Sequence, residues 1–441
     1  MKLALHGGPK TIDTAFSVYN SIGQAEEDAA LRVIRSGKLS SFLGSWNERF
    51  YGGPEVRGFE ADFAALFGVK HAVAFNSLSS GLMASVGALG IEPGDEVIVS
   101  PWTMSATATA ILVWNAIPVF ADIEPETFNL DPASVEACIT PRTKAVIVTD
   151  IFGHTARLDE LKAICQRHGL KLVEDAAQAP YARCPQGFAG CVADIGGFSL
   201  NCHKLIQTGE GGVMVTQDDQ LAERMRLIRN HGEAVVGPKG EADISNILGF
   251  NLRMCELEAA MAAEQLKRLP GLAAMRQATG ERLSQGLAGL TGLTTPVIRP
   301  GCTHVFYIYA LRLDPDALGV DRARVLDALR AEGVPHLSPG YQLLHLLPLY
   351  QRRIAHGSKG FPWSAEFYTG QVRYDEGICP VAEGLHQREL LALELGPHDY
   401  TDAEADLVIA AFRKVWDNLD ELRGQGRSEA AAGSAAGQAR P

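Results

Sequence analysis

The chain has 441 residues, of which 46% are hydrophobic, so it can bury a large core and we expect two or three structural units. Its formal net charge is -12, and a surface of that sign repels phosphate backbones at long range, which excludes nucleic acid as the expected main partner. The eight cysteines form no CxxC pair, so we expect reduced thiols in a cytoplasmic protein and no metal site.

The N-terminal segment and the longest apolar region do not suggest a membrane protein. The N-terminal residues contain one early lysine and no long apolar stretch, so we expect no signal peptide. The longest apolar region, 97–120, is interrupted by Pro101, Asn115 and Pro118. This pattern is typical of a strand, a helix and a second strand in a buried core, and we expect no membrane partner.

Strands and helices alternate along the first half of the chain. The hydrophobic pattern predicts helices at 58–67, 80–90, about 105–113, 132–138 and 158–169. It predicts strands at 71–75, 96–100, 117–123, 144–151, the start of 171–178, 196–200 and 211–216. Repeated units of this length indicate an α/β fold with a mostly parallel sheet covered by helices on both faces. Ligands of such sheets bind beyond the carboxyl ends of the strands.

The second half of the chain has a different pattern. A helical stretch, 256–269, is expected to end at Pro270, where we place a domain boundary. A strand at 304–313 and an amphipathic helix at 321–333 suit a smaller α+β domain. The expected units are an N-terminal arm, a large domain, a small C-terminal domain and a disordered tail, at 1–20, 21–270, 271–423 and 424–441.

Three short segments in order give the strongest chemical signal: EDAAQA at 174–179, FSLNCHK at 198–204 and TGEGG at 208–212. Lys204 follows a strand and precedes a glycine-rich turn, so it lies at the ligand end of the sheet. A solvated surface lysine is the ordinary alternative. The chemical alternative is an amine that desolvation keeps partly neutral near pH 7, so that it can attack an aldehyde.

Asp175 ends an apolar strand, so we expect a partly buried carboxylate that needs a partner. Such a carboxylate could hold the ring nitrogen of pyridoxal phosphate (PLP) in its protonated form, which the cofactor requires as an electron sink. A helix N-cap aspartate also follows many strands. On this residue alone the two interpretations are equal.

A serine-rich turn at 76–81 follows the strand 71–75 and opens a helix. Unpaired backbone N–H groups at a helix start, together with hydroxyls such as that of Ser79, favour a phosphate. An ordinary N-cap explains Ser79 or Ser80 equally simply. Ser199, close before Lys204, is a second candidate phosphate donor.

In this order and spacing, the segments resemble the nucleotide-sugar aminotransferases of the DegT/StrS type, which are PLP enzymes of fold type I related to aspartate aminotransferase. The resemblance covers about residues 20–415 and extends through 93–103, 119–132, 229–233, 249–260, 304–313 and 379–383. It implies an aspartate-aminotransferase-like large domain with a mostly parallel sheet and a smaller α+β C-terminal domain.

The resemblance implies a role for each matching residue. Lys204 would hold PLP as a Schiff base and shuttle protons, and Asp175 would pair with the ring nitrogen. Gln178 would contact the ring hydroxyl. The phosphate would be held by Ser199, Ser79, the backbone near Leu78 and, from the neighbouring subunit, Asn251. The enzyme would therefore be a homodimer with shared sites.

Two positions depart from the family pattern. Leu78 stands where the family often has glycine, which would be strained if that position needs a positive φ. Met104 stands where an aromatic residue usually stacks on the cofactor ring, although a thioether can also pack on a ring. We expect His203 to be structural, because neighbours on an extended chain point to opposite sides. The candidate substrate contacts are His231, Arg253, His154 and Tyr341.

The implied activity is a ping-pong transfer of an amino group from L-glutamate or L-glutamine to a keto-sugar of the NDP-keto-hexose class. A cyclitol ketone of the scyllo-inosose type is an alternative substrate, because the N-terminal segment and residues 340–350 resemble that branch. A non-catalytic PLP-binding regulator is a further alternative. A sugar dehydratase of the family would have histidine in place of Lys204.

Overall fold

The alternating segments build a seven-stranded sheet in the order β1-β9-β8-β5-β4-β2-β3. The structure is a computed structural model that describes residues 2–423. The strands are β1 (His71–Phe75), β2 (Glu96–Val99), β3 (Ile117–Phe120), β4 (Thr143–Thr149), β5 (Lys171–Asp175), β8 (Ile195–Ser199) and β9 (Gly212–Thr216). The five strands from β8 to β3 run parallel, whereas β9 pairs antiparallel with both β8 and β1. The predicted mostly parallel sheet is confirmed.

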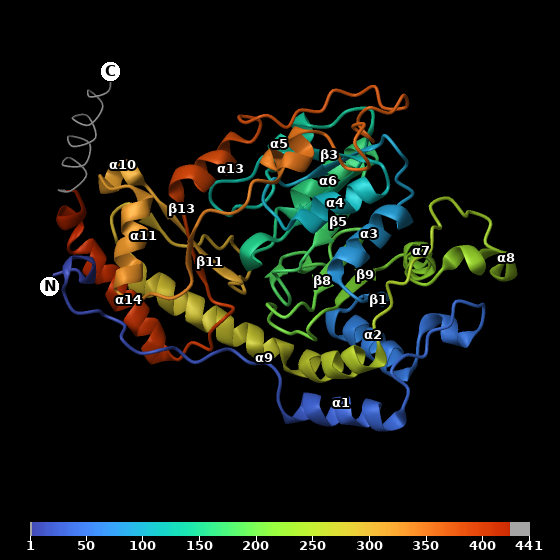
Figure 1. The fold of residues 1–441 in the computed structure, drawn as a ribbon, viewed down its shortest axis with the longest axis horizontal. Coiled ribbons are helices and arrows are strands. Elements are labelled where there is room, and N and C mark those ends of the chain that lie inside the picture. The colour runs from blue at the N-terminus through green and yellow to red at the C-terminus, as the bar shows by residue number, and fades with distance from the viewer. Residues whose placement is uncertain (1, 424–441) are drawn as a thin grey trace, which may run out of the picture.

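Helices cover both faces of this sheet (Figure 1). They are α2 (Pro54–Phe67), α3 (Leu78–Ala88), α4 (Ser105–Val113), α5 (Pro132–Ala137), α6 (Leu158–His168), α7 (Asp219–Arg229) and α9 (Glu256–Leu287). Successive strand residues alternate between the faces. Val97 and Val99 of β2 therefore pack in one core cluster with Ile111 of α4. Ile98 between them packs in another cluster with Leu161 of α6.

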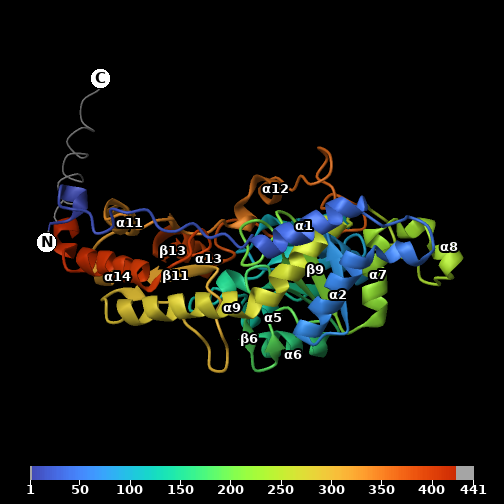
Figure 2. The ribbon, with the colours of Figure 1, turned by 90° about the horizontal axis from the view of Figure 1, so that it is seen from below.

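Helix α9 does not end at Pro270, so the predicted helix end is wrong. The helix continues for 32 residues and contains Pro270 in its interior. A proline there removes one backbone hydrogen bond and costs about 3 kcal/mol. The helix persists because it packs along its length, against α1 (Gln24–Ser36) and α2 before the proline and against α14 (Asp402–Trp416) after it. One helix thus spans the large and the small unit (Figures 1 and 2).

The small unit is built on a four-stranded sheet in the order β10-β11-β13-β12. These strands are β10 (Leu293–Thr294), β11 (Ile308–Leu313), β12 (Leu337–Pro339) and β13 (Leu390–Glu394). The remaining helices of the chain are α8 (Val236–Lys239), α10 (Pro315–Leu318), α11 (Arg322–Ala331), α12 (Pro348–Gln351) and α13 (Pro380–Gly384). A core of aliphatic and aromatic side chains joins the small sheet to α11, α14 and the end of α9.

The N-terminal segment runs along the small unit before α1 begins, as the blue trace shows in Figures 1 and 2. Its backbone donates from Ile12 to the carbonyl of Glu332 and from Tyr19 to the carbonyl of Pro397, both across 2.9 Å. Between residues 2 and 423, no helix is both long and apolar enough to cross a bilayer. The predicted disordered tail, 424–441, lies outside the described residues.

Candidate active site

A cavity of about 360 Å³ opens where β5 and β8 end, beside the first turns of α3 and α4. Eight residues singled out from the sequence line it: Leu78, Ser79, Met104, Asp175, Gln178, Ser199, Lys204 and Tyr341. The first turns of α3 and α4 and the carboxyl ends of β5 and β8 supply seven of them, while Tyr341 comes from a loop of the small unit. The cavity thus lies at the place where parallel α/β sheets bind ligands.

Asp175, the last residue of β5, is 3% exposed and holds only neutral hydrogen-bond donors. Its Oδ2 accepts the hydroxyl proton of Thr107 across 2.9 Å, and its Oδ1 accepts the backbone N–H of Ala177 across 3.1 Å. Burial raises the pKa of the carboxyl, while these two hydrogen bonds and the nearby Lys204 lower it. A cationic group of a ligand would therefore find an unshared carboxylate here.

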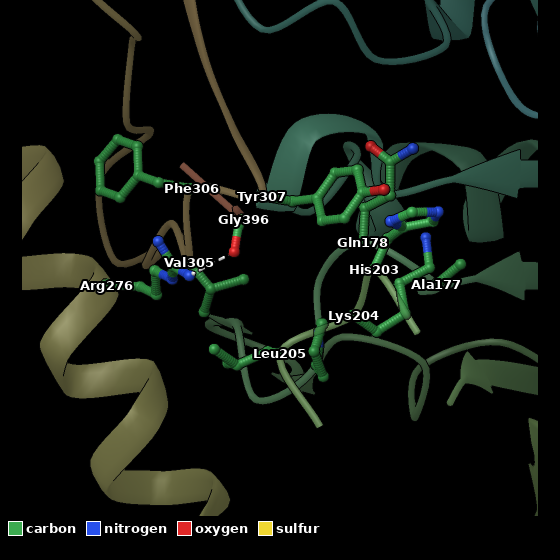
Figure 3. Close-up of a pocket in the computed structure, with 11 residues that line it drawn as sticks. Ala177, Gln178, His203, Lys204, Leu205, Arg276, Val305, Phe306, Tyr307 and Gly396 are labelled. Atoms are coloured by element: carbon green, nitrogen blue, oxygen red, sulfur yellow. Dashed lines mark hydrogen bonds between the residues drawn. The ribbon is translucent and has the colours of Figure 1, made fainter. Parts of the chain in front are cut away.

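Lys204 is half-buried, and its Nζ lies 4.3 Å from the centre of the Tyr307 ring. Burial lowers the pKa of this amine to about 8, against the smaller opposing effect of Asp175. In Figure 3 the Lys204 side chain lies beside Ala177, His203 and Gln178. A fraction of the amine is therefore neutral near pH 7, as nucleophilic attack requires.

The first turn of α3 presents backbone N–H groups to the cavity. Ser77 caps the helix by accepting the N–H of Ser80 across 3.1 Å, which leaves the N–H groups of Leu78 and Ser79 without an intrahelical acceptor. A Cβ at Gly212 would come within 2.4 Å of the Leu78 nitrogen, so glycine keeps this N–H open. Leu78 is the first helical residue, not a positive-φ residue, and leucine is unstrained there.

Gln178 is fixed by the turn that follows β4. Its Oε1 accepts the N–H of Phe152 across 2.7 Å, and its Nε2 donates to the hydroxyl of Tyr341 across 3.4 Å. Phe152 has a φ of +60°, an uncommon conformation for a bulky residue, and this turn directs its N–H at Gln178. The amide is thereby held at the cavity wall, with its NH2 group donating to Tyr341, which lines the same cavity.

His203 lines the same cavity as Lys204, so the expectation that the two side chains point to opposite sides is wrong. The expectation assumed an extended chain, whereas residues 201–206 form a turn in which Lys204 donates its backbone N–H to Asn201. Neighbouring side chains of a turn need not point to opposite sides. Figure 3 shows His203 and Lys204 close together. Met104 is 65% exposed and contributes to the rim.

Four candidate residues lie outside this cavity. His154 is 1% exposed, and both of its ring nitrogens are occupied: Nδ1 faces the carbonyl of Thr155 at 2.8 Å, and Nε2 accepts the N–H of Arg299 at 3.1 Å. It has no free atom for a substrate, and the interpretation as a contact is wrong. Asn251, Arg253 and His231 do not line the cavity of their own chain either.

Two residues of the site were not recognised in the sequence. Tyr307 was taken as part of the strand 304–313, but β11 begins only at Ile308, and Tyr307 lies before it, over Lys204. Thr107 lies in an apolar helix, and no sequence motif marked its hydroxyl as part of a site. Among residues 2–423, no cluster of three or more His, Cys, Asp or Glu side chains could hold a metal ion.

The chain is similar to named enzymes along most of its length. The L-glutamine:2-deoxy-scyllo-inosose aminotransferase of Streptoalloteichus tenebrarius is 38% identical over 443 residues, covering 96% of this chain and 99% of that protein. The GDP-perosamine synthase of Caulobacter vibrioides is 39% identical over 358 residues, covering 81% of this chain and 89% of that protein.

The fold is shared with solved structures. S. venezuelae DesV in complex with a ketimine intermediate superposes with a TM-score of 0.73 at 33% identity, covering 89% of this chain and 94% of that one. The predicted class, fold type I of the PLP enzymes, is confirmed. Residues 41–412 match the DegT/DnrJ/EryC1/StrS aminotransferase family. The cavity around Lys204 and Asp175 is therefore the candidate active site of a chain that belongs to the DegT/DnrJ/EryC1/StrS aminotransferase family.

Proposed function

We propose that this chain binds PLP through Lys204 and moves an amino group from L-glutamate or L-glutamine to a keto-sugar. The observation that supports it best is the convergence of three chemically distinct groups in one cavity: the amine of Lys204, the buried carboxylate of Asp175 and the open N–H groups at the start of α3. Each matches a different part of one small cofactor.

The residues present fit PLP. Asp175 holds no cationic hydrogen-bond partner among the described residues, as expected of a carboxylate that takes the proton of a ring nitrogen. The N–H groups of Leu78 and Ser79 and the hydroxyls of Ser79 and Ser199 would hold the phosphate. Gln178 would donate to the ring hydroxyl. A cavity of about 360 Å³ lies in the size range of small-molecule sites.

When bound, PLP supplies an aldehyde that accepts the amino group and a ring that takes up the electrons of the broken C–H bond. The residues of the chain move the protons. Lys204 Nζ would remove the α-proton of the donor and later deliver a proton to the ketone carbon of the acceptor. Asp175 would keep the ring nitrogen protonated, and its burial would exclude water from that hydrogen bond.

Two acceptor classes are consistent with the family. A nucleotide-linked keto-hexose is our first candidate, because relatives such as the GDP-perosamine synthase carry names of nucleotide-sugar enzymes. A cyclitol ketone is the second, favoured by the likeness to the 2-deoxy-scyllo-inosose aminotransferase over nearly the whole of both chains. The two classes differ in charge, which an active site can distinguish: the nucleotide-linked ketone carries a diphosphate, whereas the cyclitol ketone is uncharged.

We further propose that two chains complete each site. Asn251 is exposed and lies outside its own cavity, with its side-chain oxygen held by Arg253 across 2.7 Å. His231, also outside that cavity, follows Asn230, which bridges to Asn251 through the backbone and accepts from Arg253 across 3.2 Å. In a two-fold dimer, these polar groups would line the cavity of the partner subunit.

A half-reaction screen tests the proposed activity. The protein is loaded with pyridoxamine phosphate, single ketones are added, and the visible absorbance of the lysine-bound cofactor is followed. Return of this absorbance with a keto-sugar or a cyclitol ketone is the expected result, and borohydride trapping of PLP on Lys204 with peptide mass analysis gives an independent readout. A protein that binds PLP but regains absorbance with no ketone would overturn the proposal.

A further inference from the structure

A second cavity of about 550 Å³ adjoins the Lys204 cavity. It is lined by Val18, Tyr19, Cys202, His203, Tyr307, Ile308, Tyr341, Glu394, Gly396 and Pro397. His203, Tyr307 and Tyr341 line both cavities, so the two cavities lie next to each other and share part of their walls. A ligand whose reacting carbon reaches Lys204 therefore has this second cavity beside it.

Glu394 is the last residue of β13 and is half-buried at the wall of the second cavity. Its backbone is held by the sheet, because its N–H donates to the carbonyl of His336 across 3.1 Å. Its negative charge adds to burial in raising the pKa of both Tyr307 and Tyr341, so the carboxylate lies near those two phenols. Within residues 2–423, however, the carboxylate has no hydrogen-bond or ion-pair partner.

Among the described residues of the two cavities, no lysine or arginine forms an ion pair with this carboxylate. Lys204 is the one lysine in the two linings, and neither lining includes an arginine among the described residues. Arg276 of α9 lies close by, but its Nη2 donates to the carbonyl of Gly396 across 3.1 Å, and it lies over the ring of Tyr19 at 4.9 Å. Figure 3 shows this guanidinium directed at Gly396, in a small cavity that Arg276 lines together with Lys204.

We propose that Glu394 is a specificity-determining residue that makes this site prefer uncharged ligands to anionic ones, an inference that rests on the proposed function and selects the second of its two acceptor classes, the cyclitol ketone. An ionised carboxylate accepts hydrogen bonds from ligand hydroxyls, and bonds to charged groups are the strong ones. The same charge repels a diphosphate or a second carboxylate, and that repulsion is strong in a partly buried site.

The same carboxylate acts on both half-reactions, because the donor and the acceptor occupy one site in turn. For the acceptor, Glu394 favours a polyhydroxylated cyclic ketone without phosphate over a nucleotide diphosphate-linked ketone. For the donor, it favours L-glutamine, whose side chain ends in a neutral amide, over L-glutamate. A single substitution should therefore change both preferences in the same direction.

Calorimetric binding to the PLP-loaded protein tests this inference independently of turnover. The probes are scyllo-inositol, an uncharged cyclic polyol, and dTDP-glucose, which carries a diphosphate. Wild-type protein should bind scyllo-inositol. The Glu394→Gln variant should weaken that binding and strengthen dTDP-glucose binding, changing the affinity ratio about tenfold, as expected for one hydrogen bond to a charged group. Glu366→Gln, an exposed carboxylate outside both cavities, should leave the ratio unchanged.

The outcomes separate this inference from the proposed function. Loss of the glutamine-over-glutamate preference in the half-reaction of Glu394→Gln, with the visible absorbance of bound PLP unchanged, supports the inference. An unaltered affinity ratio in that variant, or no binding of scyllo-inositol to the wild type, overturns it even if the wild type transaminates. Failure of every ketone to restore absorbance overturns the proposed function, while the affinity ratio still decides the role of Glu394.

Discussion

The hydroxyl of Thr107 donates to the buried carboxylate of Asp175 across 2.9 Å, and it is the end of a chain of three hydroxyls. Thr149 donates to Thr103 across 3.0 Å, and Thr103 lies 2.9 Å from Thr107. Since the carboxylate can only accept, Thr107 gives its proton to Asp175 and accepts from Thr103. Hydrogen bonds in such a chain strengthen one another, and this chain holds Asp175 at the floor of the cavity.

Replacing Thr107 with valine should weaken PLP binding about tenfold, because the carboxylate loses a donor and its orientation, a loss of about 1.5 kcal/mol. Equilibrium dialysis of PLP against the cofactor-free protein measures this. Thr109→Val is a matched control on the same helix, since Thr109 donates to the carbonyl of Ala106 instead. Equal PLP affinity in the Thr107 variant and the control would show that the hydroxyl does not support Asp175.

Replacing Lys204 with alanine should remove the covalent attachment of PLP and lower transamination by at least about 10²-fold, because the chain loses both its nucleophile and its proton carrier. Mass analysis of borohydride-treated protein should show the PLP adduct on the Lys204 peptide of the wild type and no adduct in the variant. Lys162→Ala, whose amine donates to the carbonyl of Val192, should retain the adduct. An adduct at full yield in the Lys204 variant would contradict the assignment.

The rate at which cofactor-free protein attaches PLP should rise between pH 7 and about 9 and then level off, because burial lowers the pKa of Lys204 to about 8 and only the neutral amine attacks. Stopped-flow absorbance at a series of pH values measures this. Asp175→Asn should move the midpoint to lower pH, since Asp175 raises the pKa of this amine. A rate that keeps rising to pH 11 would indicate an ordinary exposed lysine.

Mixed dimers test the proposed sharing of sites. A protein with Lys204→Ala on one chain and Asn251→Ala on the other should form one intact site in which both residues are native. Partial recovery of PLP retention and transamination in the mixture, relative to either parent variant, is expected. Recovery to no more than the mean of the two parents would show that each chain completes its own site.

Acid should destabilise the protein through His154, which is buried as a neutral ring. Burial and the nearby Arg299 lower its pKa to about 4 from an ordinary value of 6.5. Between these values the unfolded chain binds the proton and the folded chain does not, so the free energy of unfolding falls as pH falls from 6.5 to 4, by about 3 kcal/mol in all. Urea unfolding of wild type and His154→Gln at several pH values checks this, and equal slopes would refute it.

Much of the large unit could be predicted because its signals are local. Apolar runs such as 144–151 and Asp or Ser caps at helix starts specify strands and helices without distant partners. The place of Lys204 and Asp175 at the ligand end of the sheet also followed, since it depends only on strand direction. The prediction that the helix ends at Pro270 was wrong because the packing of the helix on both sides of the proline outweighs the one hydrogen bond that the proline removes.

The sequence by itself determined that this protein has a mostly parallel sheet whose strand ends carry an amine, an acid and a serine turn, because each of these is set by neighbouring residues. Only the tertiary structure decided that Thr107 supports Asp175, that Tyr307 covers Lys204 and that Glu394 lines a neighbouring cavity together with Tyr307 and Tyr341. The first of these relationships joins residues 68 positions apart within the large unit, and the other two bring the small unit to the large one; no local pattern records such contacts.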